Sequence, residues 1–243
     1  MQQYFEYGDK EIEYLKSRDK KLGEVIELLG HLNRPVNPDL FFTVVDSIVG
    51  QQISTKAHAT VRARMVEGLG EITPVSIDGA SVDTLQSFGM TFRKAEYIKN
   101  FAGRVVSGEF DLDAVAKMPD EDVTRELVAL HGIGEWTAEM ILLHCLQRPN
   151  VLSFGDLAIL RGMRMVYRHR EIDRARFEKY RRRLSPYCSV ASIYFWKVSA
   201  GAIPELTDPA PAKKKVKKKA TGKARTKKNA VNKTRTKKKI AST

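Results

Sequence analysis

The chain has 243 residues, long enough for one large domain or two smaller ones with a hydrophobic core. Its two cysteines are too few for a disulfide scaffold, a four-cysteine zinc site or a four-cysteine iron–sulfur cluster, and they favour a reducing compartment. The N-terminus lacks the apolar run of a signal peptide, and no uncharged apolar run approaches the roughly 20 residues that span a bilayer. We therefore expect a cytoplasmic protein without membrane contact.

The net charge of +13 is concentrated at the C-terminal end of the chain. Of the 42 Lys and Arg residues, 15 lie in residues 211–243, and no acidic residue follows Asp208. Residues 1–210 therefore carry 27 basic and 29 acidic side chains, a net charge of −2. The sequence predicts a folded body over residues 1–207 and a disordered Lys-rich tail over 208–243, because the tail has too few large apolar side chains to offset the entropy lost on folding.

Apolar residues recur with helical spacing along the body. Leu22 to Leu29 carry this pattern, and so do Phe41 to Val49, which follow Asp39, a residue type favoured at helix N-caps. No sustained alternation or hairpin turn predicts a pair of strands. We expect an all-α fold of two helical lobes joined by chain crossovers, with a cleft between them as the usual place for a site. The further helices are expected at 92–107, 120–130, 135–147, 157–168, 174–184 and 189–200.

Two of these helices meet at a short break within "LVALHGIGEWTAEMILLH", residues 127–144. Gly132 and Gly134 permit a sharp turn, because glycine adopts positive φ at little cost and lets a bulky partner approach the backbone. Ile133 can anchor the turn inward. The second helix then begins with free N–H groups near Gly134, which suits a phosphate. Taken alone, the motif is equally consistent with an ordinary corner between two helices.

Two further motifs flank the hairpin, "SIVGQQIST" at residues 47–55 and "VLSFGDLAIL" at residues 151–160. The order G-Q-Q-I-S, then a helix-hairpin-helix with a tryptophan, then G-D-L resembles the AlkA/Mag-type 3-methyladenine DNA glycosylases of the helix-hairpin-helix glycosylase superfamily. The resemblance covers roughly residues 20 to 203. It departs from the family in two places, because there is no room for the N-terminal β domain of some relatives and the Lys-rich tail lies outside the family pattern.

Asp156 falls on the catalytic aspartate of that family. Cleavage of an N-glycosidic bond builds positive charge on the sugar, and a fixed carboxylate beside that charge stabilises the transition state. The competing interpretation is a helix N-cap, and the two are compatible because a cap is rigidly placed. No second acid is evident nearby. This agrees with alkylated purines such as 3-methyladenine and 7-methylguanine, which already carry positive charge and leave without a strong general acid.

Trp136 stands where relatives that also cut the DNA strand have a nucleophilic lysine. Tryptophan cannot form a Schiff base, so the resemblance implies a monofunctional enzyme that uses water, needs no cofactor and leaves an abasic site. Trp136 could stack on a methylated base in the pocket, or it could pack the hairpin as a core residue. The resemblance implies three further pocket positions, of which the last also fits a buried helix face: Met140, Leu157 and Trp196.

Gln51 and Gln52 lie in an apolar, helical stretch where adjacent amides are unusual. By the family pattern Gln52 is the wedge that fills the gap left by a flipped base; the alternative is a polar, exposed helix end. Arg93 and Lys94 are either phosphate contacts or a solvated face, and His144 is expected in core packing. The other DNA-binding positions that the resemblance implies are Gln51, Gly132, Ile133, Gly134 and Thr137. No catalytic metal is expected, but a structural monovalent cation could bind the hairpin carbonyls of Val128, Leu130 and Ile133.

The first hypothesis is thus a monomeric glycosylase acting by base flipping on damaged bases in double-stranded DNA, in base excision repair. The tail would bind DNA phosphates, and the protein would be nucleoid-associated, or nuclear in a eukaryote. The alternative is a non-enzymatic helix-hairpin-helix protein of the nucleoid or chromatin, which needs neither Asp156 nor the glutamine pair. A mismatch or oxidised-base glycosylase is disfavoured by the missing lysine and the missing iron–sulfur cysteines.

Overall fold

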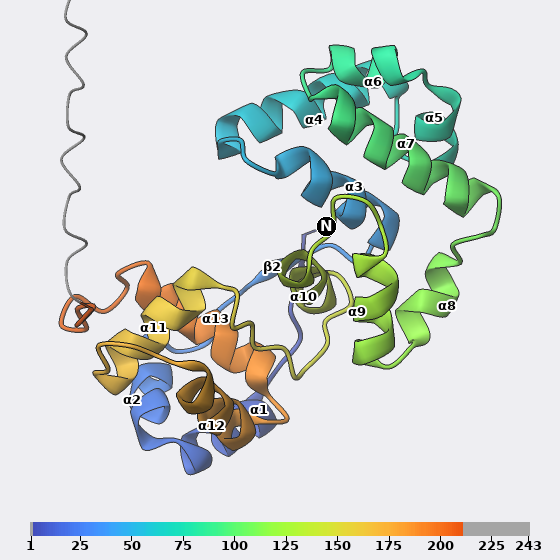
Figure 1. Cartoon of the computed structure of the whole chain (residues 1–243). Helices are drawn as coiled ribbons and strands as arrows, with labels where there is room; N and C mark the ends of the chain where they lie inside the picture. Colours follow the sequence, from blue (N-terminus) through green and yellow to red (C-terminus); the bar gives the residue numbers. More distant parts are fainter. Residues whose placement is uncertain (1, 211–243) are drawn as a thin grey trace, which may run out of the picture. The chain divides into compact units, whose positions relative to one another are not determined.

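The computed structural model describes residues 2–210, and the predicted tail lies outside them from residue 211 onward. The described residues form thirteen helices and one short ladder, in which β1 (Gln3–Tyr4) pairs antiparallel with β2 (Pro35–Val36) (Figure 1). The prediction of an all-α body is therefore confirmed apart from these four residues. No helix in this part of the chain is long and apolar enough to cross a membrane.

The helices form two lobes, as predicted (Figure 1). The first lobe comes from the middle of the chain: α3 (Leu40–Gly50), α4 (Thr55–Leu69), α5 (Pro74–Gly79), α6 (Val82–Ser87), α7 (Phe92–Val106), α8 (Leu112–Lys117), α9 (Asp120–Val128) and α10 (Glu135–His144). The second lobe combines both ends of the body: α1 (Asp9–Arg18), α2 (Lys20–Leu29), α11 (Leu157–Tyr167), α12 (Arg174–Leu184) and α13 (Cys188–Ser199). The chain crosses between the lobes twice, at residues 30–39 and 145–156.

Local sequence signals predicted eight of the thirteen helices among the described residues. Asp39 accepts the N–H of Phe42 at 2.9 Å, so it caps α3 as expected. Helix α10 ends at His144, three residues before the predicted end. Helix α1 and four others were not predicted. Helix α4 has only two buried side chains in fifteen residues, and α5, α6 and α8 have six residues each and begin at side-chain caps rather than on an apolar stripe.

The second lobe is built on a close approach of α11 to α13. A Cβ atom on Gly162 would lie 2.2 Å from the carbonyl oxygen of Phe195, so only glycine allows this packing. Helix α13 is buried along most of its length, whereas α11 buries one face. This packing fixes the N-terminus of α11, where Asp156 stands, against the rest of the body.

The folded body extends slightly past the predicted boundary at residue 207. Asp208 accepts hydrogen bonds from Nε and Nη2 of Arg164, at 2.9 and 2.6 Å, and from the N–H of Ala210 at 3.1 Å. The side-chain hydrogen bond from Arg164 lowers the pKa of Asp208, so the pair stays ionised at neutral pH. The charged tail therefore begins after a segment that is tied to α11.

Candidate active site

The hairpin between α9 and α10 is held inward by two adjacent residues. Gly132 has a φ of 89°, and a Cβ there would lie 2.7 Å from Cδ2 of Tyr97, so both conformation and space require glycine. Ile133 is 5% exposed and donates its N–H to the carbonyl of Leu130 at 3.1 Å. The tip of the hairpin thus packs against Tyr97 of α7 at Gly132, and Ile133 is buried, which agrees with its predicted role as an inward anchor.

Gly134 has a different role from Gly132. Its φ is −101° and a Cβ there would meet open space, so the backbone does not demand glycine. It is the N-cap residue of α10 and has no side chain to cap the helix. The first helical bond runs from Ala138 N–H to Gly134 O at 3.0 Å, which leaves the preceding N–H groups of Glu135 to Thr137 without a helical acceptor. This helix end suits an anion such as a DNA phosphate.

The glutamine pair lies in a turn, so the prediction that it sits inside a helix is wrong. Helix α3 ends at Gly50, and Gln51 Nε2 donates to the carbonyl of Gly132 at 2.6 Å. Lys94 Nζ donates to the carbonyls of Val49 and Gln51, at 2.8 and 2.5 Å, and burial lowers its pKa. Lys94 is therefore a clamp on this turn rather than part of a solvated face, and the turn is tied to the hairpin.

Gln52 is the exposed tip of the same turn. Its φ is 56°, a left-handed conformation that is uncommon for residues other than glycine and costs about 1 kcal/mol or more. The interactions of Gln51 on one side and the Ser54 cap of α4 on the other hold the backbone in this conformation. The side chain of Gln52 is thus presented outward on a rigid support.

Asp156 is both a helix cap and the best-held carboxylate near the hairpin. Its Oδ1 accepts the N–H groups of Ala158 and Ile159 at 2.8 and 2.9 Å, which caps α11. Its Oδ2 accepts the indole N–H of Trp136 at 3.1 Å. The residue is only 6% exposed. Both sequence interpretations of Asp156 are therefore structurally compatible, since three N–H donors fix the orientation of the carboxylate.

A cavity of about 510 Å³ opens between the α3–α4 turn and α10. Trp136, 49% exposed, lines it with two other predicted site residues of α10, Thr137 and Met140. The residues that line it from the other side are Asp46, Ser47, Gly50, Gln51, Gln52 and His58. Asp46, which the sequence did not single out, accepts a hydrogen bond from His58 Nε2 at 2.8 Å. The structure thus brings most of the predicted pocket and wedge residues to one hollow.

Leu157 and Trp196 are placed differently from the prediction. Leu157 is 80% exposed at the start of α11, so it does not line the cavity beside Trp136. Trp196 is half-buried on α13, and its ring contacts one side chain of α10 and one of the crossover between α2 and α3. The His144 ring stacks on it at a centroid distance of 5.3 Å, and the Arg34 guanidinium lies 4.9 Å from its centroid. Trp196 therefore contacts His144 and Arg34, and its role in the substrate pocket stays a prediction.

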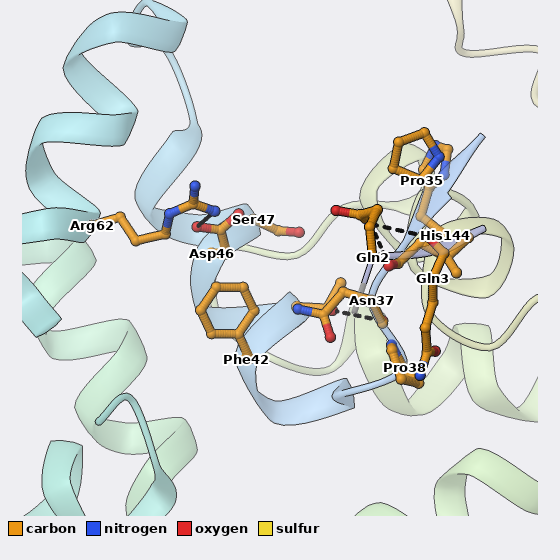
Figure 2. A pocket seen from close by; sticks show the side chains of 12 residues that line it. Gln2, Gln3, Pro35, Asn37, Pro38, Phe42, Asp46, Ser47, Arg62 and His144 are labelled. Carbon is orange, nitrogen blue, oxygen red and sulfur yellow. Dashed lines mark hydrogen bonds and ion pairs between the residues drawn. The ribbon is translucent and has the colours of Figure 1, made fainter. Parts of the chain in front are cut away.

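A second cavity, of about 740 Å³, adjoins the first along α3 (Figure 2). The two share Asp46 and Ser47 as lining residues. His144 lines the second cavity, which corrects the prediction that it is only a core residue. Trp136, Met140 and His144 are spaced by four residues on α10 and so lie on one helix face. This spacing was visible in the sequence and could have marked His144 as part of the site.

Charge in this region is set mainly by burial. The pKa of His144 is lowered to about 4, first by burial and second by the positive charge of Arg34, whereas the negative charge of Asp156 opposes the shift. Burial also lowers the pKa of Arg34, against the raising effect of Asp156. At neutral pH His144 is thus neutral beside a charged guanidinium. Since arginine can only donate, Arg34 Nη2 donates to His144 Nε2 at 3.3 Å.

The sequence and the two-lobed helical fold that carry this hairpin and aspartate resemble those of known proteins. Residues 45–186, from α3 to α12, match the sequence profile of the HhH-GPD superfamily base excision DNA repair proteins. The chain belongs to the HhH-GPD superfamily. The match includes the glutamine turn, the hairpin and Asp156.

Several known proteins resemble this chain over most of its length. A crystal structure of a DNA-3-methyladenine glycosidase from Bacillus halodurans is 32% identical and superposes with a TM-score of 0.75, covering 84% of this chain and 95% of the other. DNA-3-methyladenine glycosylase 1 from Schizosaccharomyces pombe is 26% identical over 209 residues, 83% of this chain and 91% of the relative. A Schizosaccharomyces pombe 3-methyladenine DNA glycosylase in complex with abasic DNA shares the fold, with 24% identity, a TM-score of 0.69 and coverage of 82% and 99%.

The depressed pKa of His144 makes a prediction about stability. An unfolded His144 takes up a proton near pH 6.5, whereas the folded one resists until about pH 4. The contribution to folding is therefore fully present above pH 6.5 and is lost as the pH falls toward 4, by about 3 kcal/mol at most. We expect a His144→Gln variant to show a shallower loss of unfolding free energy between pH 6.5 and 4.5 in urea titrations. A pH dependence identical to that of the native protein would contradict this assignment.

Proposed function

We propose that the protein is a monofunctional DNA glycosylase that hydrolyses the N-glycosidic bond of alkylated purines, such as 3-methyladenine and 7-methylguanine, in duplex DNA. It leaves an abasic site for base excision repair. The observation that carries the proposal is the buried Asp156 carboxylate, hydrogen-bonded to Trp136 beside a cavity and close to the open N-terminus of α10. The names of the relatives, DNA-3-methyladenine glycosidase and glycosylase, support the choice of substrate.

DNA binding begins with the backbone. The N–H groups at the start of α10 hold a phosphate beside the lesion, without reading sequence. The damaged nucleotide leaves the stack and its base enters the hollow beside Trp136 and Met140. Gln52, rigid and exposed on its turn, fills the gap and offers its amide to the orphaned partner base. Gln51 acts indirectly, because its amide is already bound to Gly132.

The chemistry rests on one carboxylate. As the N-glycosidic bond lengthens, the sugar gains positive charge, and the Asp156 carboxylate stabilises it. A water molecule, oriented by Asp156, forms the new bond to C1′ and gives its proton to the carboxylate. The alkylated base leaves with the bonding electron pair and so loses its formal positive charge. Because Asp156 is already held by three N–H groups, little reorganisation is needed when the charge develops.

A passive DNA-binding protein of the nucleoid or chromatin explains these features less well. Such a protein needs phosphate contacts, but it does not need a buried carboxylate hydrogen-bonded to a cavity-lining tryptophan, or an exposed glutamine in a left-handed conformation. The hairpin carbonyls fit a structural monovalent cation in part. The carbonyl of Leu130 already accepts the N–H of Ile133, so only its second lone pair is left for an ion. The carbonyls of Val128, Leu130 and Ile133 would hold that ion, which would take no part in the reaction.

We propose that the protein acts where the DNA is, in the nucleoid or the nucleus.

Asp156→Asn tests the catalytic assignment. Asparagine can keep the cap on Ala158 and Ile159 through its carbonyl oxygen, but it removes the charge. We expect base release from methylated duplex DNA, identified by chromatography, to fall by about 10²-fold or more under single-turnover conditions, with DNA binding retained. Asp173→Asn is the matched control, because Asp173 caps α12 in the same way on the exposed surface. Near-native release by the Asp156 variant would refute the role.

The tryptophan at position 136 predicts the fate of the strand. Without a lysine there, borohydride should trap no covalent protein–DNA adduct, and strands should break only after added alkali. Lys94 is the lysine to test if an adduct does form, because burial lowers its pKa. An adduct that disappears in a Lys94→Met variant would show that the enzyme is not monofunctional.

The Lys-rich tail is proposed as a sequence-independent DNA-binding arm. Its 15 basic residues adjoin a body of net charge −2, so most long-range attraction to DNA belongs to the tail. A chain ending at Ala210 keeps the contacts of Asp208. We expect it to bind undamaged duplex more weakly, with a much shallower salt dependence, because each neutralised phosphate contributes a slope of roughly −0.9.

Single-turnover base release at saturating enzyme should be nearly the same for the truncated and full chains, since the cavity belongs to the helical lobes. The measurement is binding to plain duplex across a salt series beside release rates on methylated DNA. An unchanged salt slope would exclude the arm, and a collapsed saturating rate would place the tail in the active site.

A further inference from the structure

Asp46 is a charged side chain in the candidate site that the proposed mechanism does not use. It lies on α3 and lines both the hollow of about 510 Å³ beside Trp136 and the adjoining cavity of about 740 Å³ (Figure 2). Among the described residues that line these two cavities, Asp46 is the only acidic one. Trp136 lines the hollow from α10 and Asp46 lines it from α3, so a base stacked on Trp136 would have this carboxylate in the wall across from it.

The Asp46 carboxylate is supported at one of its two oxygens. Its Oδ1 accepts a hydrogen bond from His58 Nε2 at 2.8 Å, and Nη1 of Arg62 lies 3.9 Å from the same oxygen. A Cβ on Gly50 would lie 3.0 Å from Cε1 of His58, so the missing side chain at Gly50 makes room for the ring. In the part of the chain that the structure describes, no hydrogen bond engages Oδ2, and the side chain is 26% exposed. One oxygen is thus anchored, and the other is available to a ligand in the cavity.

We propose that Asp46 is a specificity-determining residue whose negative charge selects a positively charged purine in the pocket, with Oδ2 accepting an N–H of the flipped base. The inference rests on the proposed glycosylase function and names the property of the base that the site reads. Both proposed substrates carry a positive charge and N–H donors, at the C6 amino group of 3-methyladenine and at N1 and the C2 amino group of 7-methylguanine. A carboxylate offers acceptors only, so it matches these groups in charge and in hydrogen bonding.

The same charge discriminates between bases when the N-glycosidic bond breaks. A methylated purine takes the bonding electron pair and leaves as a neutral molecule, whereas an unmethylated purine such as hypoxanthine takes the same pair and becomes an anion. A carboxylate beside the base raises the barrier to the second departure, because like charges repel in a poorly screened site. For the methylated base the attraction weakens as its charge is lost, so Asp46 contributes to capture of the flipped base rather than to bond breaking. The negative wall therefore favours damaged bases and protects normal purines.

The test compares 7-methylguanine with hypoxanthine, a cationic and a neutral base, each at a defined position in the same duplex. Single-turnover release of both, and affinity for plain duplex, are measured for the native protein, Asp46→Asn and Asp122→Asn. Asparagine can still accept the hydrogen bond of His58, but it carries no charge. Asp122 is the matched control, because its carboxylate is also paired with an arginine, Arg125 at 2.6 Å, and lies outside both cavities. We expect the 7-methylguanine-to-hypoxanthine rate ratio to fall by roughly tenfold or more in Asp46→Asn and to stay native in Asp122→Asn.

Arg62→Met tests the same charge in the opposite direction, since it removes the positive neighbour and leaves Asp46 in place. The Arg62 side chain is 49% exposed, so this variant takes over the test should Asp46→Asn fail to fold. We expect the ratio to rise by about threefold or more. A ratio that stays native or falls in Arg62→Met would overturn the proposal. If hypoxanthine release stays at the spontaneous level throughout, 7-methylguanine release must fall in Asp46→Asn and rise in Arg62→Met, and any other pattern overturns the proposal.

The outcomes separate this inference from the proposed function. A native ratio in Asp46→Asn overturns the inference and leaves the glycosylase function intact. Equal losses on both bases would mean that Asp46 only supports the fold, and would overturn the inference as well. Failure of the native protein to release any base from methylated DNA refutes the function itself, and the inference with it.

Discussion

One hydrogen bond joins the two halves of the site, from the indole N–H of Trp136 to Oδ2 of Asp156 at 3.1 Å. Trp136 belongs to the hairpin lobe, and Asp156 is the N-cap of α11 in the other lobe. The bond therefore sets the position of the carboxylate relative to the open helix end that would hold a phosphate. The second oxygen of Asp156 is engaged by the cap of α11, so the carboxylate cannot rotate away. In the proposed reaction, this bond would fix the DNA phosphate and the charge that develops on the sugar relative to each other.

A second set of contacts fixes the α9–α10 hairpin relative to the turn that carries Gln51 and Gln52. Gln51 donates a hydrogen bond to the hairpin carbonyl of Gly132, and Lys94 donates to the carbonyls of Val49 and Gln51 in the turn. These side-chain donors are engaged by carbonyl groups of the protein itself. Their effect is to leave Gln52 in a left-handed conformation at the tip, where its side chain is free to act. Of the polar residues that the sequence suggests as DNA contacts, Gln51 and Lys94 therefore support the turn, whereas Gln52 remains exposed at its tip.

Burial decides the charge state of the inner end of the site. His144 is kept neutral, whereas Arg34 remains charged because the intrinsic pKa of a guanidinium is so high. A neutral acceptor and a charged donor can then share one hydrogen bond on the ring of Trp196. The near-neutral body contrasts with the strongly basic residues after 210, so the proposed function would assign recognition of the base to the body and general attraction to DNA to the tail.

The sequence by itself determined the features that depend on residues close together in the chain, namely most of the helices, their caps and the short motifs. Apolar spacing and caps such as Asp39 placed the long helices, and the order of the three motifs singled out Asp156, Trp136 and the hairpin glycines. Only the tertiary structure decided which of the other candidates meet. In the structure Leu157 is exposed to solvent, the glutamine pair lies in a turn, and Arg34 contacts His144, which is 110 positions away in the chain. Helical periodicity and capping are local, so they are written in short stretches of sequence. Contacts between distant residues arise from the packing of α10, α11, α13 and the crossovers, which no local pattern encodes.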